Sequence, residues 1–299
     1  MSNLMTRAIT KDGSARAYIL NSTNMVNDAI AIHKTQPTAT ALLGRLLTAT
    51  SIMGTMLPEA GNRITVTIKG DGLAGRTLCC GDYFGNVKGY ISNPFADLPP
   101  KKNGKLDVSG IVGKGILYVS KDVGDEEPYN GTVELVSGEV AEDIVQYYAI
   151  SEQIPTLCAL GVLVDVDHLC KAAGGIIVQL LPFADEKVIA RLEENAKQLN
   201  NISLKFAQGL SNEDILNIAL NGIEYDIFDT LNVDYKCDCS RERTSRALLS
   251  LGKKEVEDIL REQKEKGDEK IEVECHFCNK KYIYTREDAL SLFEKSKKS

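Results

Sequence analysis

Four of the eight cysteines stand in two closely spaced pairs towards the end of the chain. Cys237 and Cys239 form a C-x-C motif, and Cys275 and Cys278 form a C-x2-C motif after 35 intervening residues. Cysteine thiolates are favoured zinc ligands, and four of them fill a closed tetrahedral shell. In a chain that shows no secretory features, this clustering favours a metal site over a disulfide framework. We therefore predict that these four cysteines bind Zn²⁺.

The other cysteines and the histidines have different surroundings. Four cysteines lie in apolar, strand-like stretches, where cysteine behaves as a small hydrophobic residue. We expect them in the core, and they are Cys79, Cys80, Cys158 and Cys170. His276 is an alternative fourth ligand, although four cysteines already complete the shell. His33 and His168 lack a paired ligand nearby, and we expect both to be structural.

Basic side chains follow both halves of the cysteine cluster. A zinc tetrathiolate carries a local charge of about -2, because four thiolates outweigh one Zn²⁺. The nearby cations either offset this charge or are ordinary solvated charges on helix faces, and they are Arg241, Arg243, Arg246, Lys280 and Lys281.

Oxidation offers the same sulfurs a second arrangement. Sulfurs on zinc lie roughly 3.8 Å apart, whereas disulfide sulfurs lie about 2.05 Å apart, so the two states exclude each other. Neighbouring cysteines would close most readily, Cys237 with Cys239 and Cys275 with Cys278. The C-x-C bridge needs a bent, strained chain, and strained disulfides are easily reduced. The spacing thus favours a reversible switch.

The region around the cysteines, residues 237–299, is too small to be stable without help. A core of this size rarely supplies more than about 3–5 kcal/mol, whereas a structural zinc contributes roughly 10–16 kcal/mol. Loss of the metal is expected to unfold the predicted helices 241–251 and 253–266. It would also remove support from the preceding segment and expose apolar surface, which binds unfolded chains. A strand is predicted over 280–284, with a helix from about residue 285.

The first 182 residues mix strand and helix periodicities. Short strands are predicted over 17–20, 64–68, 87–91, 116–119 and 132–136. Helices are predicted over 23–33, 38–56 and 139–152. In the second helix an apolar side is formed by Leu42, Leu43, Leu46, Leu47 and Met53. This order of elements indicates an α+β fold.

Residues 183–236, called the linker below, are acidic and helical in pattern. The linker carries 5 Lys and Arg against 10 Asp and Glu. A helix is predicted over 185–199, and Ser211 to Asp214 resembles a capping box for a helix that continues to Leu220. Helices this short are marginal alone and must gain stability from packing. We therefore expect three regions: an α+β core domain (1–182), a metastable helical linker (183–236) and a C-terminal zinc-binding module (237–299).

Composition excludes several classes of protein. The 299 residues are 43% hydrophobic and 26% charged, as in a soluble globular protein. No apolar run reaches the roughly 18 residues of a membrane span. The first residues show no signal peptide, which indicates a cytoplasmic protein. A net charge of -7 disfavours nucleic acid as the main partner.

Several motifs resemble one known family, the redox-regulated heat-shock holdase chaperones called the 33 kDa chaperonin. The resemblance covers essentially the whole chain. It is carried by CDCSRER (237–243), ALLSLG (247–252), VECHFCN (273–279) with Tyr282, SEQIP (151–155) and AGGIIVQLLP (173–182). The first and third motifs are specific in combination, whereas a lone C-x2-C would be a weak signal.

The resemblance implies a function and a switch. Cys237, Cys239, Cys275 and Cys278 would hold zinc in a reduced, inactive state that is a monomer. Peroxide or hypochlorite, helped by heat, would form two disulfides, expel zinc, unfold the linker and give an active dimer. The active state would bind unfolded client proteins without ATP, and the sequence has no G-x4-G-K-[ST] phosphate loop. The family is not an enzyme family.

Two alternatives start from the same cysteines. A zinc-ribbon protein would bind nucleic acid, but residues 237–299 carry 15 basic against 14 acidic side chains. A thiol-disulfide oxidoreductase would use Cys275 and Cys278. Such enzymes usually place C-x2-C at the start of a helix, whereas a strand is predicted here. The holdase function is favoured over both.

Overall fold

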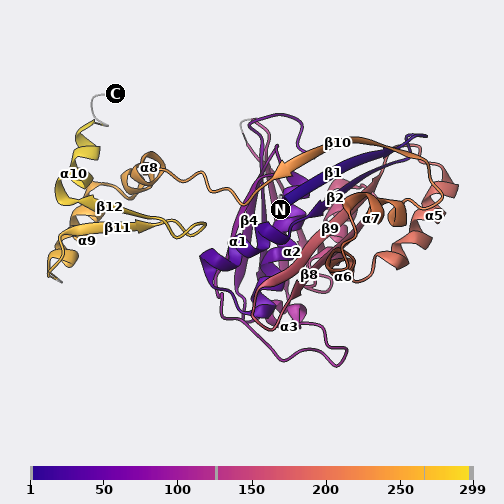
Figure 1. The fold of residues 1–299 in the computed structure, drawn as a ribbon. Helices are drawn as coiled ribbons and strands as arrows, with labels where there is room; N and C mark the ends of the chain where they lie inside the picture. The colour runs from indigo at the N-terminus through magenta and orange to yellow at the C-terminus, as the bar shows by residue number, and fades with distance from the viewer. Residues whose placement is uncertain (1–2, 125–126, 266, 296–299) are drawn as a thin grey trace. The chain divides into compact units, whose positions relative to one another are not determined.

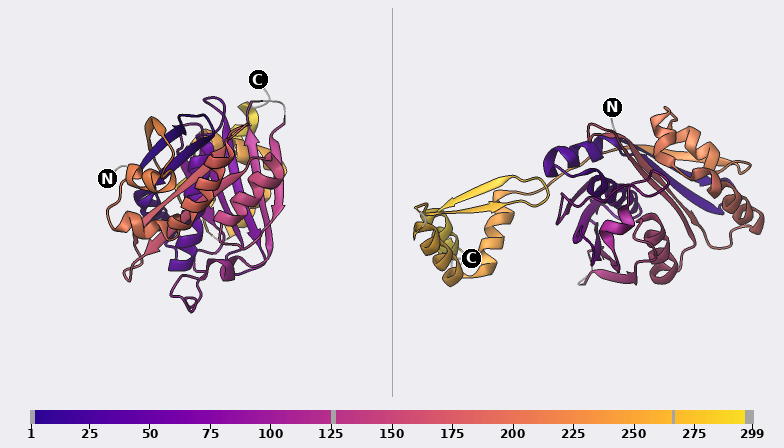
Figure 2. Two further views of the ribbon diagram at one scale, coloured as in Figure 1. Left: turned by 90° about the vertical axis from the view of Figure 1, so that its right-hand side faces the viewer. Right: turned by 90° about the horizontal axis from the view of Figure 1, so that it is seen from below.

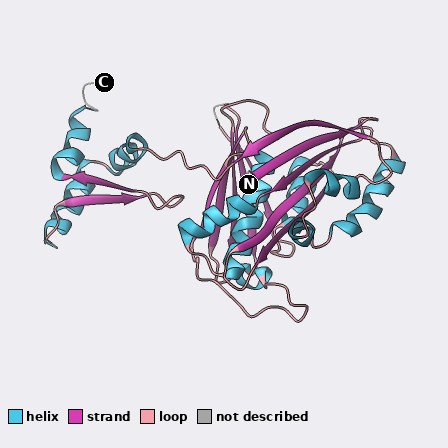
Figure 3. Cartoon of the chain, in the orientation of Figure 1, coloured by secondary structure: helices cyan, strands magenta, loops and turns pink. Residues whose placement is uncertain are grey.

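The structure of the chain is a computed structural model that describes residues 3–124, 127–265 and 267–295. Its contacts divide the chain into two compact units, Met1–Lys236 and Cys237–Ser299. Both units contain helices and strands (Figures 1 and 3), so the predicted α+β class is confirmed. Within the described ranges, no helix is both long enough and apolar enough to cross a membrane.

Two antiparallel sheets form the framework of the first unit. The first sheet has the order β10 (Tyr225–Val233), β1 (Asn3–Thr10), β2 (Ala15–Asn21), β9 (Cys170–Leu180) and β8 (Thr156–Val164). The second has the order β5 (Val87–Ile91), β4 (Arg76–Asp82), β3 (Arg63–Gly70), β6 (Gly115–Asp122) and β7 (Tyr129–Glu134). Alternate residues of β3 and β4 are buried, which identifies one face of the second sheet as its core face.

Helix α2 (Pro37–Gly54) lies between the two sheets and contacts strands of both. Sixteen of its 18 residues are buried. The helix is therefore buried on nearly every side, and not only along the one apolar side that the sequence predicts. A helix enclosed by sheets needs small or apolar residues on every side. One of its buried hydroxyls, that of Thr48, donates to the carbonyl of Gly44 at 2.7 Å and lies 2.7 Å from the hydroxyl of Ser22. The other helices of this core are α1 (Thr23–His33), α3 (Val108–Val112) and α4 (Ala141–Tyr147), the last followed by a π-helical turn (Tyr148–Glu152).

Three linker helices cover the outer face of the first sheet (Figure 2): α5 (Glu186–Ala196), α6 (Ile202–Ala207) and α7 (Asn212–Ala219). A short 3₁₀ turn (Lys197–Leu199) joins the first two. On the sheet side, this second core consists of Ala8, Ala15, Ala17, Ile19, Ala172, Ile176 and Val178. On the linker side it consists of Leu192, Leu199, Ile202, Phe206, Ile215, Leu216, Ala219 and Leu220. The linker thus hides a largely aliphatic sheet face from water.

Glycines allow α6 to lie close to the sheet. Gly161 of β8 and Gly174 of β9 are cross-strand partners. A Cβ atom on Gly161 would lie 2.8 Å from the backbone nitrogen of Ser203, and one on Gly174 would overlap the Phe206 ring. The missing side chains therefore provide the space that the helix occupies.

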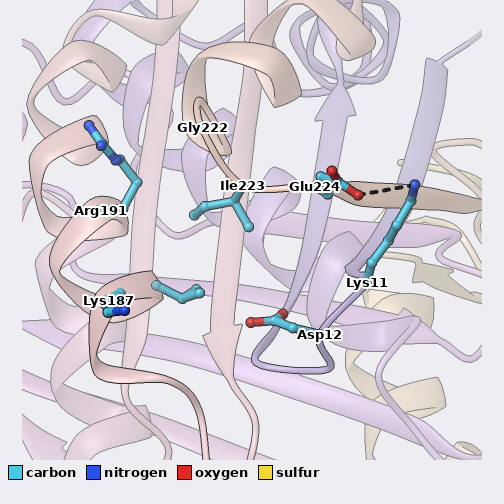
Figure 4. A pocket seen from close by; sticks show the side chains of 8 residues that line it. Lys11, Asp12, Lys187, Arg191, Gly222, Ile223 and Glu224 are labelled. Carbon is cyan, nitrogen blue, oxygen red and sulfur yellow. Dashed lines mark ion pairs between the residues drawn. The ribbon is translucent and has the colours of Figure 1, made fainter.

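Helix α5 is the most weakly anchored of the three. Two of its eleven residues, Leu192 and Asn195, are buried. Beside it lies a depression that is lined mainly by charged side chains and separates the helix from the turn between β1 and β2 (Figure 4). An exposed ion pair with a 3.4 Å separation joins Lys11 to Glu224 there, and pairs of this kind contribute little stability.

The last part of the linker is a strand, which the helical pattern of this segment does not predict. β10 pairs with β1 along its whole length and is the edge of the first sheet. The register shifts between Arg7 and Ala8, which leaves Phe228 as an extra, 71% exposed residue. The guanidinium of Arg7 lies 5.2 Å from the centre of that ring and pairs with Asp229. Backbone pairing with β1 therefore outweighs the weak local preference of this acidic stretch for helix.

Just after β10, the side chain of Tyr235 makes hydrogen bonds to other parts of the first unit. The hydroxyl of Tyr235 donates to the carbonyl of Gly89 at 2.7 Å and lies 3.1 Å from Nε2 of His33. Burial lowers the pKa of His33, which favours its neutral form. The expected structural role of His33 is thereby confirmed.

Within residues 237–265 and 267–295, the second unit contains three helices and one hairpin. They are α8 (Arg241–Leu251), α9 (Lys253–Glu265), β11 (Lys270–Glu274), β12 (Lys281–Thr285) and α10 (Arg286–Lys295). The described residues of this unit form a buried core of seven side chains: Leu248, Val256, Leu260, Ile271, Tyr282, Tyr284 and Ala289. The helix expected over 253–266 is present to Glu265, and Lys266 lies outside the described residues.

An ion-pair network joins three parts of the first core. The carboxylate of Glu139 accepts hydrogen bonds of 2.6 Å from Lys101 and from Arg45. Burial alone would raise the pKa of Glu139, but these two cations lower it to about 2. The ionised form is therefore favoured in the folded state.

We expect Glu139 to make stability dependent on acid. Because the folded pKa lies below the unfolded one, the stabilisation is complete above about pH 4.5 and is lost as the pH falls towards 2. Glu139→Gln should lower the free energy of unfolding by about 2–3 kcal/mol at pH 7. The difference from the unsubstituted protein should shrink at pH 3. Urea unfolding at both pH values tests this, and a constant difference would contradict it.

Candidate metal centre

The four C-terminal cysteine sulfurs converge on one point in the second unit. All four lie within 4.8 Å of one another. The sulfurs of Cys239 and Cys278 lie 3.4 Å apart, and those of Cys237 and Cys275 lie 3.7 Å apart. All are free, half-buried thiols. A tetrahedral tetrathiolate requires sulfurs roughly 3.8 Å apart, so this donor set fits a structural zinc site.

The C-x2-C half occupies the turn between β11 and β12. The amide of Cys275 donates to the carbonyl of Lys280 at 3.0 Å, which closes the turn. Asn279 has a φ of 56°, a left-handed conformation that asparagine tolerates better than most residues. This bend directs the amide of Lys280 to the sulfur of Cys278. The turn thus supplies a backbone donor that stabilises a thiolate.

The C-x-C half lies in the loop before α8. Ser240 caps this helix by accepting a 3.2 Å hydrogen bond from the amide of Arg243. The guanidinium of Arg243 pairs with Asp238 at 2.7 Å, across the short motif. The amide of Cys239 donates to the sulfur of Cys237. The shorter spacing therefore still provides one backbone hydrogen bond to a ligand.

The thiols differ in their tendency to ionise. Burial opposes ionisation of Cys239, but hydrogen bonds from the Tyr282 hydroxyl, at 3.1 Å, and from Cys278 lower its pKa to about 7. In contrast, burial raises the pKa of Cys237. Since the thiolate is the form that binds metal, Cys239 is prepared for coordination at neutral pH.

The five basic residues near the cysteines contact groups other than sulfur. Arg241 is 3.2 Å from Asp288, Arg243 pairs with Asp238, Arg246 is 3.9 Å from Glu242, Lys281 is 2.7 Å from Glu272, and Lys280 lies over the ring of Tyr282. These contacts favour the interpretation of the cations as surface charges over direct compensation of the thiolates.

The other cysteines lie in the first unit. Cys79 and Cys170 are buried as expected, whereas Cys80 and Cys158 are half-buried. Burial raises the pKa of Cys158 and of Cys170 to about 12, so both stay protonated and unreactive at neutral pH.

The remaining histidine candidates lie at turns. His168 is exposed between β8 and β9, with a φ of 66°. His276 is inside the C-x2-C turn, but the group of converging ligand atoms consists of the four sulfurs. The four-cysteine set therefore fits better than a set in which His276 replaces one thiolate.

Comparison with known proteins agrees with the motifs. A family model described as "Hsp33 protein" matches residues 3–285. This chain belongs to the Hsp33 family. The 33 kDa chaperonin of Clostridioides difficile (strain 630) is 47% identical to it over 98% of this chain and 99% of its own length. The 33 kDa chaperonin of Alkaliphilus metalliredigens is 44% identical over the same shares of the two chains.

A solved structure has the same fold as this Hsp33-family chain. The crystal structure of the 33 kDa chaperonin of Thermotoga maritima, a heat shock protein 33 homolog, matches with a TM-score of 0.90. The two sequences are 35% identical, and the match covers 100% of each chain. The chain is accordingly a chaperone of the Hsp33 type with a cysteine cluster that could hold a metal ion.

The arrangement of the C-x2-C motif differs from that of a thiol-disulfide oxidoreductase. Such enzymes place the motif at the N-terminus of a helix, which activates the first cysteine. Here strand β12 follows Cys278, and α10 begins at Arg286. The motif therefore lies in the turn between two strands and not at the start of a helix.

Proposed function

We propose that this chain is an ATP-independent holdase that binds unfolded client proteins when its cysteine centre is oxidised. Membership of a chaperone family supports the chaperone part. The observation that carries the redox part is the convergence of four free thiols within 4.8 Å, in a unit whose described residues form a core of seven buried side chains. Such a unit depends on its ligands for stability, so a chemical change at sulfur can control its folding.

In the reduced state, Cys237, Cys239, Cys275 and Cys278 would hold Zn²⁺. The ion would supply a cross-link between the loop before α8 and the β11–β12 turn. The chain itself provides the four thiolates and two backbone amides that donate hydrogen bonds to them. The hairpin partly shields the sulfurs from solvent. We propose zinc because this tetrahedral, all-sulfur donor set is typical of structural zinc sites.

Oxidation would convert the four thiolates into two disulfides, Cys237–Cys239 and Cys275–Cys278. Each bond forms as two sulfurs lose two electrons and one hydrogen peroxide is reduced to two hydroxide ions. The folded sulfurs are close in every combination, including two pairs that join the two halves. Neighbours are favoured once the unit opens, because loops of one and two residues close at the least entropic cost.

The linker is the part that would respond. Its helices cover aliphatic residues of β1, β2 and β9, and α5 has few buried side chains. When the second unit unfolds, the chain that follows β10 is no longer folded. We propose that the linker then detaches from the sheet. The exposed sheet face would bind clients and a second copy of the chain, which gives a dimer from a reduced monomer. We assign the protein to the cytoplasm and expect no enzymatic activity, no nucleic-acid partner and no membrane partner.

We expect peroxide-treated protein to suppress the aggregation of a thermally unfolded client at roughly equimolar ratio, while reduced, zinc-loaded protein does not. Metal release, free thiols and light scattering should be measured on one sample. Oxidised protein should release one zinc and lose four of eight thiols. Peptide mapping under non-reducing conditions identifies the disulfides. Equal suppression by both states would refute the switch, and retention of all eight thiols would refute its chemistry.

A further inference from the structure

Tyr282 joins the hairpin of the second unit to a ligand on the opposite loop. It lies on β12, is 7% exposed, and its hydroxyl donates to the sulfur of Cys239 at 3.1 Å. The ammonium of Lys280 lies 5.3 Å from the centre of its ring. Cys239 itself packs against the buried core of the unit. This hydrogen bond is therefore fixed by packing on both sides.

A second tyrosine on the same face of β12 provides a contrast. Tyr284 is 1% exposed, and its hydroxyl donates to the carbonyl of Arg241 at 2.9 Å and is 2.6 Å from the hydroxyl of Thr244. Its partners are thus oxygen atoms of α8. The two side chains share a strand, a face and a depth of burial, and they differ in whether the hydroxyl reaches sulfur.

Hydrogen bonding to a thiolate changes its reactivity. When a thiolate attacks hydrogen peroxide, a sulfur lone pair forms the S–O bond, the O–O bond breaks and hydroxide leaves. A second thiolate then attacks the resulting sulfenic acid, forming the disulfide and releasing another hydroxide. A donor on the sulfur withdraws electron density from the attacking lone pair, so the first step is slower. Hydrogen bonds of this kind also orient metal ligands and tune their binding.

We propose that Tyr282 sets the peroxide sensitivity of the centre as a positioning residue, because its hydroxyl holds Cys239 in the ligand set and slows the reaction of that sulfur with peroxide. The inference rests on the proposed function, and it adds a residue that adjusts the oxidant level at which the switch operates. Tyr284 has no such role, since its hydroxyl is bonded to α8.

The test compares Tyr282→Phe with the matched control Tyr284→Phe in the full-length, zinc-loaded protein. Zinc release at a fixed peroxide concentration is followed with a coloured chelator. Loss of an outer-shell hydrogen bond typically changes metal binding about 10- to 100-fold, so Tyr282→Phe should release zinc about tenfold faster. Tyr284→Phe should stay within about twofold of the unsubstituted protein. Equal rates for the two variants would overturn the proposal.

A spectroscopic measurement separates the hydrogen bond from a general loosening of the fold. In protein loaded with Co²⁺, the sulfur-to-cobalt charge-transfer band should move to longer wavelength in Tyr282→Phe, because the sulfur lone pair rises in energy. The band should not move in Tyr284→Phe. Should Tyr282→Phe fail to fold, 3-fluorotyrosine at position 282, a stronger donor of similar size, should slow zinc release instead.

Failure of the proposed function looks different. In that case the unsubstituted protein keeps its zinc in peroxide, or loses it without gaining chaperone activity, and the proposed role of Tyr282 falls with it. If the unsubstituted protein switches normally but Tyr282→Phe has an unchanged rate and an unchanged cobalt spectrum, this inference alone is wrong.

Discussion

Removal of the metal from the reduced protein with a strong chelator should unfold the second unit and leave the two sheets of the first unit folded. Over the part of the second unit that the structure describes, seven side chains form the core, and a core of that size contributes about 3–5 kcal/mol. A structural zinc contributes about 10–16 kcal/mol, so the fold cannot persist without it. Amide hydrogen exchange should show complete loss of protection over α8, α9, β11 and β12, while β3 and β6 stay protected.

The variant Cys239→Ser tests the same dependence without a chelator. It removes one ligand and should give a partly unfolded second unit with zinc affinity lowered by several orders of magnitude. Cys80→Ser is a suitable control, because Cys80 is a half-buried thiol of the first unit. It should leave zinc content and exchange in residues 237–295 unchanged. Full protection of the hairpin in zinc-free protein would show that the metal does not hold this fold.

Replacement of Phe206 by alanine should release the linker without any oxidant. The Phe206 side chain is 7% exposed and fills the space above Gly174 that a side chain on the sheet would otherwise occupy. Truncation of a buried phenylalanine costs about 3–5 kcal/mol, and α6 has six residues with which to compensate. Reduced, zinc-loaded Phe206→Ala should therefore suppress client aggregation nearly as well as the oxidised unsubstituted protein.

An exposed phenylalanine provides the control for this variant. Phe95 is 68% exposed, so Phe95→Ala should leave the reduced protein inactive. The zinc content of both variants should be measured as well, because release of the linker alone is expected to leave the metal bound. If Phe206→Ala loses linker protection in hydrogen exchange and still fails to bind clients, the covered sheet face is not the client site.

Sequence patterns correctly predicted the elements that are determined by neighbouring residues, such as helices and their caps. Thr23–His33 is a helix with the expected bounds, and the capping box of Ser211 and Asp214 is present at the start of α7. Two of the strands that the pattern does not predict, β9 and β1, have burial that depends on tertiary contacts. β9 is buried on both faces and shows no alternation, because α1 and α2 cover one face and the linker covers the other.

β1 reverses the usual pattern of polarity. Leu4 and Ile9 are 39% and 40% exposed, whereas Asn3 and Thr10 are buried. The buried polar groups have specific partners, since Asn3 accepts from the amide of Met25 at 2.9 Å, and Thr10 accepts from a neighbouring amide at the same distance. The first amide belongs to α1 and the second to Ala15 at the start of β2, so both partners lie outside the strand and its own periodicity cannot predict it.

The sequence identified the four cysteines that converge in the structure, and nothing more of the candidate site. The pairs Cys237/Cys239 and Cys275/Cys278 identify themselves by type and spacing. The donor from Tyr282 depends on how the hairpin faces the loop before α8, which no local pattern encodes. One available signal is alternation along β12, because it places Tyr282 and Tyr284 on the same inward face, beside the cysteine turn.

The edge position of β10 has a consequence for what the protein can hold. As long as β10 is in place, its backbone satisfies that of β1 from Thr10 to Asn3. If the linker detached up to Val233, β1 would become an exposed edge strand whose backbone amide and carbonyl groups have no hydrogen-bond partners. Any extended polypeptide can pair with such an edge strand, because main-chain groups are common to all sequences. Recognition of this type does not depend on side chains, which suits a chaperone that binds many different misfolded proteins.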